Sequence, residues 1–270
     1  MPLKEKIIQH YDEISPYYRD LWGIHIHHGY WKTGLETKEE AQEQLIDCLI
    51  SHAQIQRCAT ILDVGCGLGG TAIYLHKKIG AHVTGVTISP RQIEIANELA
   101  QSRGADVRLM LMDAESLTLG GSFDVVLSVE AISHLNHKAD CFHSMARLLK
   151  AGGKLVIADW FRSHTASPEE EFEFLRPVER AMLVPKLESP SVYMKYVTAT
   201  GLNVIKFEDL STNVQKTWDL ATDLIKNPTL WKLAAALGPD FLVFLDGFRA
   251  MKAAYKSKAL VCGLLIGQKK

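Results

Sequence analysis

The chain contains 270 residues, of which 47% are hydrophobic and 23% charged, a composition typical of a globular protein with an extensive core. Its 30 lysine and arginine residues against 31 aspartate and glutamate residues give a formal net charge of −1. No basic excess favours a nucleic-acid partner, and no apolar run approaches the roughly 18 residues that a membrane span requires.

The N-terminal 36 residues are rich in aromatic and histidine side chains but show no clear period. They lack the apolar core and small-residue cleavage site of a signal peptide, and we interpret them as an aromatic lid. A helix is predicted next, because Thr37 and Glu40 form a T-x-x-E capping-box pattern. Ala41, Leu45 and Leu49 then repeat on one helical face.

From residue 60 to residue 160, short apolar runs alternate with helical stretches, which indicates βαβ units and a mostly parallel sheet. The predicted strands are 61–64, 82–88, 107–112, 123–129 and 154–160, and the predicted helices lie near 71–79, 90–103 and 138–150.

The remainder of the chain continues this sheet less regularly. Ser167 and Pro168 predict a helix start, and further strands are expected at 203–211 and 260–268 with helices between them. We expect an α/β fold with a Rossmann-like sheet of seven mostly parallel strands and helices on both faces. The expected division is an N-terminal lid (1–58), a cofactor-binding core (59–160) and remaining strands with a helical acceptor cover (161–270).

The segment ILDVGCGLGG (residues 61–70) lies where a predicted strand turns into a helix. Gly65, Gly67 and Gly70 satisfy the dinucleotide fingerprint G-x-G-x-x-G, in which glycines allow a tight turn and a close ligand. Three features argue against a dinucleotide. Asp63 replaces the usual apolar residue, no acid stands about 20 residues further on, and two more strands follow the fifth unit.

Four further segments join this motif: VTGVTISPRQ (83–92), MDAESL (112–117), FDVVLSVEAISHL (123–135) and LLKAGGKLVIADW (148–160). Together they resemble the class I S-adenosylmethionine-dependent methyltransferases. The segment LWGIHIHHGYW (21–31) with GVTISP resembles the tocopherol C-methyltransferases and their alkaloid N-methyltransferase relatives within that class. Cyclopropane-fatty-acid synthases share part of this pattern but carry a cysteine where His28 aligns.

The resemblance implies S-adenosylmethionine as the cofactor and assigns it a site. The glycine loop would border the methionine portion, the end of the second strand the ribose, and MDAESL the adenine, with His27 near the methionine carboxylate. Thr87 stands where many members of the class carry an acid, which implies a weaker ribose contact. The expected cofactor-binding residues are Tyr18, His27, Asp63, Gly65, Cys66, Gly67, Gly69, Thr87, Ile88, Gln92, Asp113, Ala114 and Val129.

His134 is the candidate general base among 11 histidines, because it follows Glu130 by four residues at the carboxyl edge of the predicted sheet. If this stretch starts a helix, both side chains share a face, and Glu130 would orient His134 or the cofactor. The alternative is a helix-start histidine that holds a backbone carbonyl.

No metal is expected. His25 and His27 would share one face of an extended segment while His28 points away, and no matching acid cluster is evident. The five cysteines are scattered without a C-x-x-C pair, which indicates free thiols and a cytoplasmic protein rather than a zinc site or disulfide framework.

These observations predict methyl transfer to a small, largely apolar acceptor, with aromatic, alkaloid and terpenoid secondary metabolites as candidates. Two alternatives remain open: a cyclopropane-forming or cyclising S-adenosylmethionine enzyme, and a cofactor-binding partner protein without catalysis. The expected partners are the small-molecule acceptor alone or a second copy of the chain, with no nucleic acid.

Overall fold

A computed structural model describes residues 1–270 around a seven-stranded sheet with the strand order β3-β2-β1-β4-β5-β7-β6. The first five strands, β1 through β5, are parallel to one another, and β7 runs antiparallel to both β5 and β6. This confirms the predicted Rossmann-like sheet of seven mostly parallel strands. The strands are β1 (Thr60–Val64), β2 (His82–Thr87), β3 (Arg108–Leu111), β4 (Phe123–Val129), β5 (Leu149–Arg162), β6 (Asn203–Asp209) and β7 (Leu260–Gln268).

Helices cover both faces of the sheet, because successive residues of its central strands are apolar on both sides. Ile61 belongs to one buried apolar cluster and its neighbour Leu62 to a second one. The longer helices are α1 (Leu3–Tyr17), α2 (Lys38–Ala53), α3 (Gly70–Ile79), α4 (Pro90–Ser102), α5 (Lys138–Arg147), α8 (Pro190–Ala199), α10 (Lys216–Leu224), α11 (Pro228–Leu237) and α12 (Pro239–Lys256). The shorter ones are α6 (Pro168–Glu170), α7 (Arg176–Ala181) and α9 (Ser211–Val214).

The predicted helix starts at Thr37 and Ser167 are confirmed, since both residues form complete capping boxes. The main difference in the sheet concerns β5, which begins at Leu149 rather than near residue 154. Gly152 has a φ of +74°, and the register between β4 and β5 shifts nearby. The two glycines therefore form an irregularity within the strand instead of ending the preceding helix, which stops at Arg147.

The N-terminal segment is more regular than the sequence analysis predicted. Helix α1 is followed by a π-helical turn (Tyr18–Trp22). Ile7, Tyr11, Ile14 and Tyr18 follow helical spacing and line one cavity. The expectation of no clear period was wrong, because histidines, charges and Pro16 obscure this stripe.

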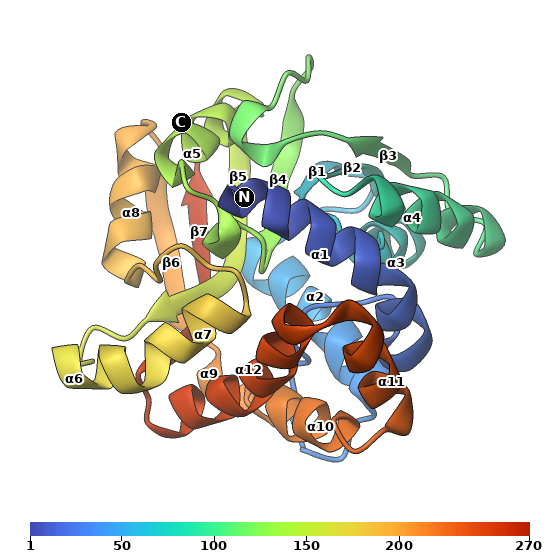
Figure 1. Ribbon diagram of the computed structural model, residues 1–270. Helices are drawn as coiled ribbons and strands as arrows, with labels where there is room; N and C mark the ends of the chain where they lie inside the picture. Colours follow the sequence, from blue (N-terminus) through green and yellow to red (C-terminus); the bar gives the residue numbers. More distant parts are fainter.

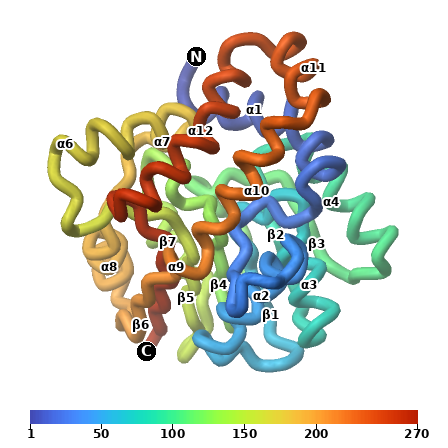
Figure 2. The backbone as a smooth tube through the Cα atoms, turned by 90° about the horizontal axis from the view of Figure 1, so that it is seen from below, coloured from blue at the N-terminus to red at the C-terminus, as the bar shows by residue number.

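Helix α1 lies beside α4 at the carboxyl edge of the sheet (Figure 1). It also packs against the C-terminal helices, since the rings of His10 and Phe244 are 4.7 Å apart between centroids. Figure 2 shows α1, α11 and α12 together at one end of the molecule and the C-terminus near the other. No helix combines the length and the apolar character needed to cross a membrane.

Candidate active site

One large cavity opens at the carboxyl ends of β1, β2 and β4, and 31 of its 50 lining residues are hydrophobic. Every predicted site residue except Gly69 lines this cavity. Gly69 instead precedes α3 with a φ of +79°, where a Cβ would meet the side chains of Leu109 and Ala96. Its missing side chain thus permits close packing against β3 and α4.

The loop after β1 is held against β2, because the backbone N–H groups of Gly65 and Cys66 both donate to the Val86 carbonyl. A Cβ on Gly67 would touch only the Ile26 side chain, at 3.5 Å, so this backbone stays open to the cavity. At Gly70 a Cβ would lie 2.6 Å from the Ile24 carbonyl oxygen. The last glycine of the apparent dinucleotide fingerprint therefore admits the N-terminal segment and not a phosphate.

Asp63, the penultimate residue of β1, is an almost completely buried carboxylate, 1% exposed, and its Oδ2 has no hydrogen-bond partner. Burial raises the pKa of this carboxyl group to about 7. The Nε2 atom of His27 is also buried without a partner. Both residues line the cavity, so its polar end offers unsatisfied groups to a ligand.

The hydrogen bonds of His27 indicate which of its ring nitrogens carries the proton. Its Nδ1 lies 2.8 Å from the His28 carbonyl oxygen and therefore donates to it. Burial lowers the pKa of His27, which favours the neutral ring with an accepting Nε2. Together with Asp63, this nitrogen suits a protonated amino group, whereas the resemblance placed it near the methionine carboxylate.

Asp63 should make the ligand-free protein less stable as the pH rises from about 4 to about 7. Because its pKa is raised from 3.8 to about 7, the folded chain keeps a proton that the unfolded chain loses in this range. The wild-type slope should therefore be steeper than that of Asp63→Asn by up to about 1.4 kcal/mol per pH unit.

Urea unfolding of both proteins between about pH 4.5 and about pH 7.5 measures this difference. Burial also raises the pKa of Asp159 to about 7, but Asp159 is present in both proteins and cancels. Identical slopes would show that Asp63 is hydrated in the folded state.

The expected ribose contacts lie together at the end of β2. Thr87 donates a hydrogen bond of 2.5 Å from Oγ1 to Oε1 of Gln92, and both residues line the cavity beside Ile88. Ser89 caps α4 by accepting from the Gln92 backbone N–H. The wall expected to meet the ribose is thus rigid and polar.

Helix α1 contacts the expected adenine and ribose side of the cavity. The Lys4 ammonium lies 2.7 Å from Asp113 and 2.6 Å from Glu115. Asp12 accepts hydrogen bonds from the Ser89 hydroxyl and the Arg91 backbone N–H. Lys4 and Asp12 could not be predicted as site residues, because single charged residues on a helix give no signal of a distant partner.

Glu130 and His134 both line the cavity, but they do not form the expected pair. Glu130 follows β4 with a φ of +53°, and its carboxylate contacts His28 instead. Residues Ile132–His134 form a single 3-10 turn, so the two side chains do not share an α-helical face.

His134 makes two ring contacts of its own. Its Nδ1 lies 3.3 Å from the Leu183 carbonyl oxygen, as the carbonyl-holding alternative proposed, and therefore donates there. Its Nε2 lies 3.4 Å from the Tyr11 hydroxyl. Burial lowers the pKa of His134, which favours a neutral ring with an accepting Nε2. The geometry is compatible with a base whose active nitrogen faces α1.

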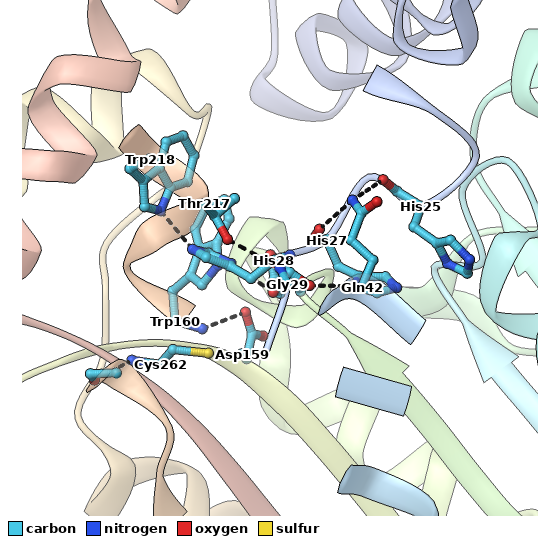
Figure 3. Close-up of polar contacts among 12 residues, drawn as sticks. His25, His27, His28, Gly29, Gln42, Asp159, Trp160, Thr217, Trp218 and Cys262 are labelled. Carbon is cyan, nitrogen blue, oxygen red and sulfur yellow. Dashed lines mark hydrogen bonds and ion pairs between the residues drawn. The ribbon is translucent and has the colours of Figure 1, made fainter. Parts of the chain in front are cut away.

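His28, which the sequence places in the predicted lid and which we weighed as a metal ligand, is a central hydrogen-bonding residue. Its ring contacts the rings of Trp160, Trp218 and Tyr255 edge to face. Figure 3 shows the two tryptophans beside His28. His28, Glu130 and Cys262 each bring one potential ligand atom within 4.8 Å of the others. Both His28 nitrogens are nevertheless engaged by protein groups, and burial raises the pKa of the Cys262 thiol. This chemistry does not favour a cation.

Comparisons with known proteins agree with this architecture. The chain is 31% identical over 247 residues to a probable chloroplastic tocopherol O-methyltransferase of Oryza sativa subsp. japonica, covering 85% of this chain and 67% of the relative. It is 30% identical over 253 residues to a 27-O-demethylrifamycin SV methyltransferase of Amycolatopsis mediterranei (strain S699), covering 92% of each.

The fold matches the solved structure of mycolic acid cyclopropane synthase CmaA1 complexed with SAH and CTAB. The TM-score is 0.87, at 22% identity and 99% coverage of each chain. The profile of the mycolic acid cyclopropane synthetase family matches residues 2–236. The chain therefore belongs to that family, and it is a class I methyltransferase whose cofactor is S-adenosylmethionine.

Proposed function

We propose that the cavity transfers a methyl group from S-adenosylmethionine to a small, largely apolar acceptor. The observation that carries this proposal is a single cavity with a polar end and an apolar wall. The glycine loop and Asp63 form a polar end, whereas aromatic and aliphatic side chains of the helical cover form the rest. The apolar wall includes Trp218, Leu224, Leu230, Leu233, Phe241, Phe244 and Phe248.

The polar end fits the proposed cofactor. Asp63 and His27 have acceptor atoms without partners, which a protonated amino group would satisfy. Gly67 leaves room for a ligand against the backbone, while Thr87 and Asp113 offer oxygens further along the same wall. Each of these residues is proposed to hold the cofactor, together with the other predicted residues that line the cavity.

When bound there, S-adenosylmethionine supplies a methyl group on a sulfonium centre. The apolar helices exclude water and position the acceptor, which removes much of the entropic cost of bringing two reactants together. His134 accepts the acceptor's proton at Nε2, which carries no proton because Nδ1 donates to Leu183 and whose one protein contact is the Tyr11 hydroxyl at 3.4 Å. Glu130 adds a negative charge close by.

Gly67→Val should reduce the affinity for S-adenosylmethionine by at least about 100-fold, because the branched side chain would occupy the open cavity wall. Gly104→Val is the matched control, since Gly104 also has a left-handed φ but ends α4 with nothing near its Cβ position. Calorimetry measures the affinity, and circular dichroism checks the fold. Equal binding by the two variants, or tight binding of NADH by the wild type, would contradict the proposed cofactor site.

The acceptor is proposed to be a small secondary metabolite with an apolar aromatic, alkaloid or terpenoid body. The apolar cavity wall supports this class, and the relatives' names mention tocopherol and demethylrifamycin as their acceptors. A screen of small phenols, indoles and amines by mass spectrometry tests it. A reaction without added acceptor serves as the control. S-adenosylhomocysteine that forms there shows consumption of the cofactor without methyl transfer to an acceptor.

The family name and the likeness to a cyclopropane synthase favour cyclopropanation as a second candidate. Methylation and cyclopropanation each add one carbon, so counting the product's protons by NMR distinguishes them. A partner protein without catalysis would bind the cofactor but release no S-adenosylhomocysteine.

We also propose the three-part division into a lid (1–58), a cofactor-binding core (59–160) and an acceptor cover (161–270). Contacts of α1 with Asp113 and Ser89 support a covering role for the first part. The five free cysteines support a reducing compartment such as the cytoplasm. We further propose that the protein acts as a monomer or homo-oligomer and does not bind nucleic acid.

A further inference from the structure

His28 lines the cavity at an almost completely enclosed position, with 1% of its surface exposed. The loop that carries it is fixed on both sides, since Gln42 donates to the carbonyls of His25 and His27 and Thr217 accepts from the Gly29 N–H (Figure 3). A histidine on such a loop cannot move without breaking several buried hydrogen bonds.

The hydrogen bonds around His28 define its tautomer. The indole Nε1 of Trp218 lies 2.6 Å from His28 Nε2, and an indole N–H can only donate. Nε2 therefore accepts and carries no proton. The ring proton must reside on Nδ1, which lies 2.7 Å from Oε1 of Glu130 and donates to it. The indole of Trp160, 3.3 Å from Nδ1, is then a packing contact.

Glu130 receives a second donor from the same residue, because the His28 backbone N–H lies 3.0 Å from Oε1. Both contacts end on one carboxylate oxygen. Oε2 accepts no hydrogen bond from the protein, and it is not completely buried. The carboxylate is thus clamped by one oxygen while the other remains available to a ligand in the cavity.

We propose that His28 is a positioning residue that keeps Glu130 ionised and directs its free oxygen into the cavity. This inference deepens the proposed function, because it explains how the protein maintains a buried negative charge beside a cationic methyl donor. It assigns no proton transfer to His28, whose Nε2 is occupied by Trp218.

The backbone of Glu130 supports this interpretation independently. Its φ of +53° is unusual for a non-glycine residue, and its N–H donates to the Ala158 carbonyl at 2.7 Å. Strained backbone of this kind persists where the surrounding structure holds it, commonly at functional sites. The hydrogen bonds from His28 hold the Glu130 side chain in the position to which this backbone conformation directs it, and they thereby help to stabilise the conformation.

The surroundings of Glu130 would otherwise favour its protonated form. Burial alone raises the pKa of Glu130, but the hydrogen bonds from the ring and the backbone of His28 oppose this effect, and the resulting pKa is lowered. The other titratable groups that interact with the Glu130 charge are Tyr11, His134, Asp159, Tyr255 and Cys262. Since none of these is an Arg or Lys, His28 supplies the main support for the carboxylate.

The ionisation of Glu130 tests the proposal directly. Proteins labelled with ¹³C at the glutamate carboxyl carbon are titrated by NMR, and the signal absent from Glu130→Gln identifies the residue. His28→Leu should raise the pKa of Glu130 by about one unit or more, because the ring donor disappears. His28→Gln can still donate from its amide and should recover part of the change.

The histidine ring provides a second measurement on the unmodified protein. ¹⁵N correlation spectra should show His28 protonated at Nδ1 and not at Nε2. His52→Leu is the matched control, since His52 also bonds a neighbouring side chain, Cys48, but makes no contact with Glu130. An unchanged Glu130 titration in folded His28→Leu, or a proton on Nε2 of His28, would overturn the proposal.

Cofactor calorimetry separates this inference from the proposed function. If the wild type fails to bind S-adenosylmethionine, the proposed function fails whatever the titration shows. If the wild type binds it and the His28 variants leave the Glu130 titration unchanged, only the positioning role fails. Circular dichroism and thermal melting confirm that each variant is folded before its spectra are interpreted.

Discussion

His134→Ala should lower the turnover number by about 10²- to 10⁴-fold while the affinity for S-adenosylmethionine changes only a few-fold. The substitution removes the nitrogen proposed to take the acceptor's proton but leaves the glycine loop and Asp63 intact. His134 contacts only Leu183 and Tyr11 through its ring nitrogens, so its loss should not disturb the polar end of the cavity.

The rate is measured as S-adenosylhomocysteine release with an acceptor found in the screen, and calorimetry gives the cofactor affinity. His143→Ala is the control, because the Nδ1 of His143 also holds a backbone carbonyl, that of Ala139, on the exposed side of α5. A decrease of less than about tenfold would show that His134 is structural and that proximity carries the reaction.

The pH dependence follows from the same residue. Because burial lowers the pKa of His134, the neutral base should remain available below the ordinary histidine range. The acid limb of the wild-type rate should therefore lie below pH 6.5, and it should disappear in His134→Ala. An acid limb above that value would mean that another group limits the reaction.

The sheet could be predicted from the sequence because its signals are local. Each parallel strand is a short apolar run, and the two clusters on its faces require the alternation that Ile61 and Leu62 show. The β1 loop likewise needs left-handed φ values at Gly65 and Gly67, which glycine alone adopts without strain. Patterns of this kind are visible within ten residues.

The contacts within the site were less predictable, because they join segments far apart in the chain. His28 and Glu130 are 102 residues apart, and Lys4 and Asp113 are 109 apart. Spacing within one segment instead suggested Glu130 with His134, which requires an α-helix that a 3-10 turn replaces. Such pairings depend on which loop crosses the edge of the sheet, and the hydrophobic period of a sequence does not indicate the path of a loop.

The role of the N-terminal segment also becomes narrower. From the sequence we predict that residues 1–31 become ordered on cofactor binding, but in the structure the part around His25 to Gly29 is already held by Gln42 and Thr217. Deleting all of it would remove core residues such as Trp31. Helix α1 is therefore the part most suited to act as a lid, because polar rim contacts and one aromatic stripe hold it.

Slower hydrogen exchange upon addition of S-adenosylhomocysteine should consequently be concentrated in α1 and the turn Tyr18–Trp22. The exchange of residues 25–31 should already be slow without ligand. Ligand-independent exchange throughout α1 would indicate a fixed helix and remove the lid from the mechanism.

Removal of residues 2–17 should reduce turnover by at least about 10²-fold and weaken cofactor binding, while the sheet remains folded. The truncation opens the cavity to water and removes Tyr11 from His134 and Lys4 from the rim. The sheet should persist because its first strand begins at Thr60 and its apolar clusters draw mainly on later residues. A single change, Lys4→Ala, should weaken cofactor binding to a smaller degree, whereas Lys6→Ala, an exposed neighbour on the same helix, should not.

Calorimetry measures cofactor binding, circular dichroism checks the fold, and the release of S-adenosylhomocysteine measures turnover. Full turnover by a folded truncated protein would show that α1 only packs against the core, and that the apolar helices α10 to α12 suffice to exclude water from the reaction.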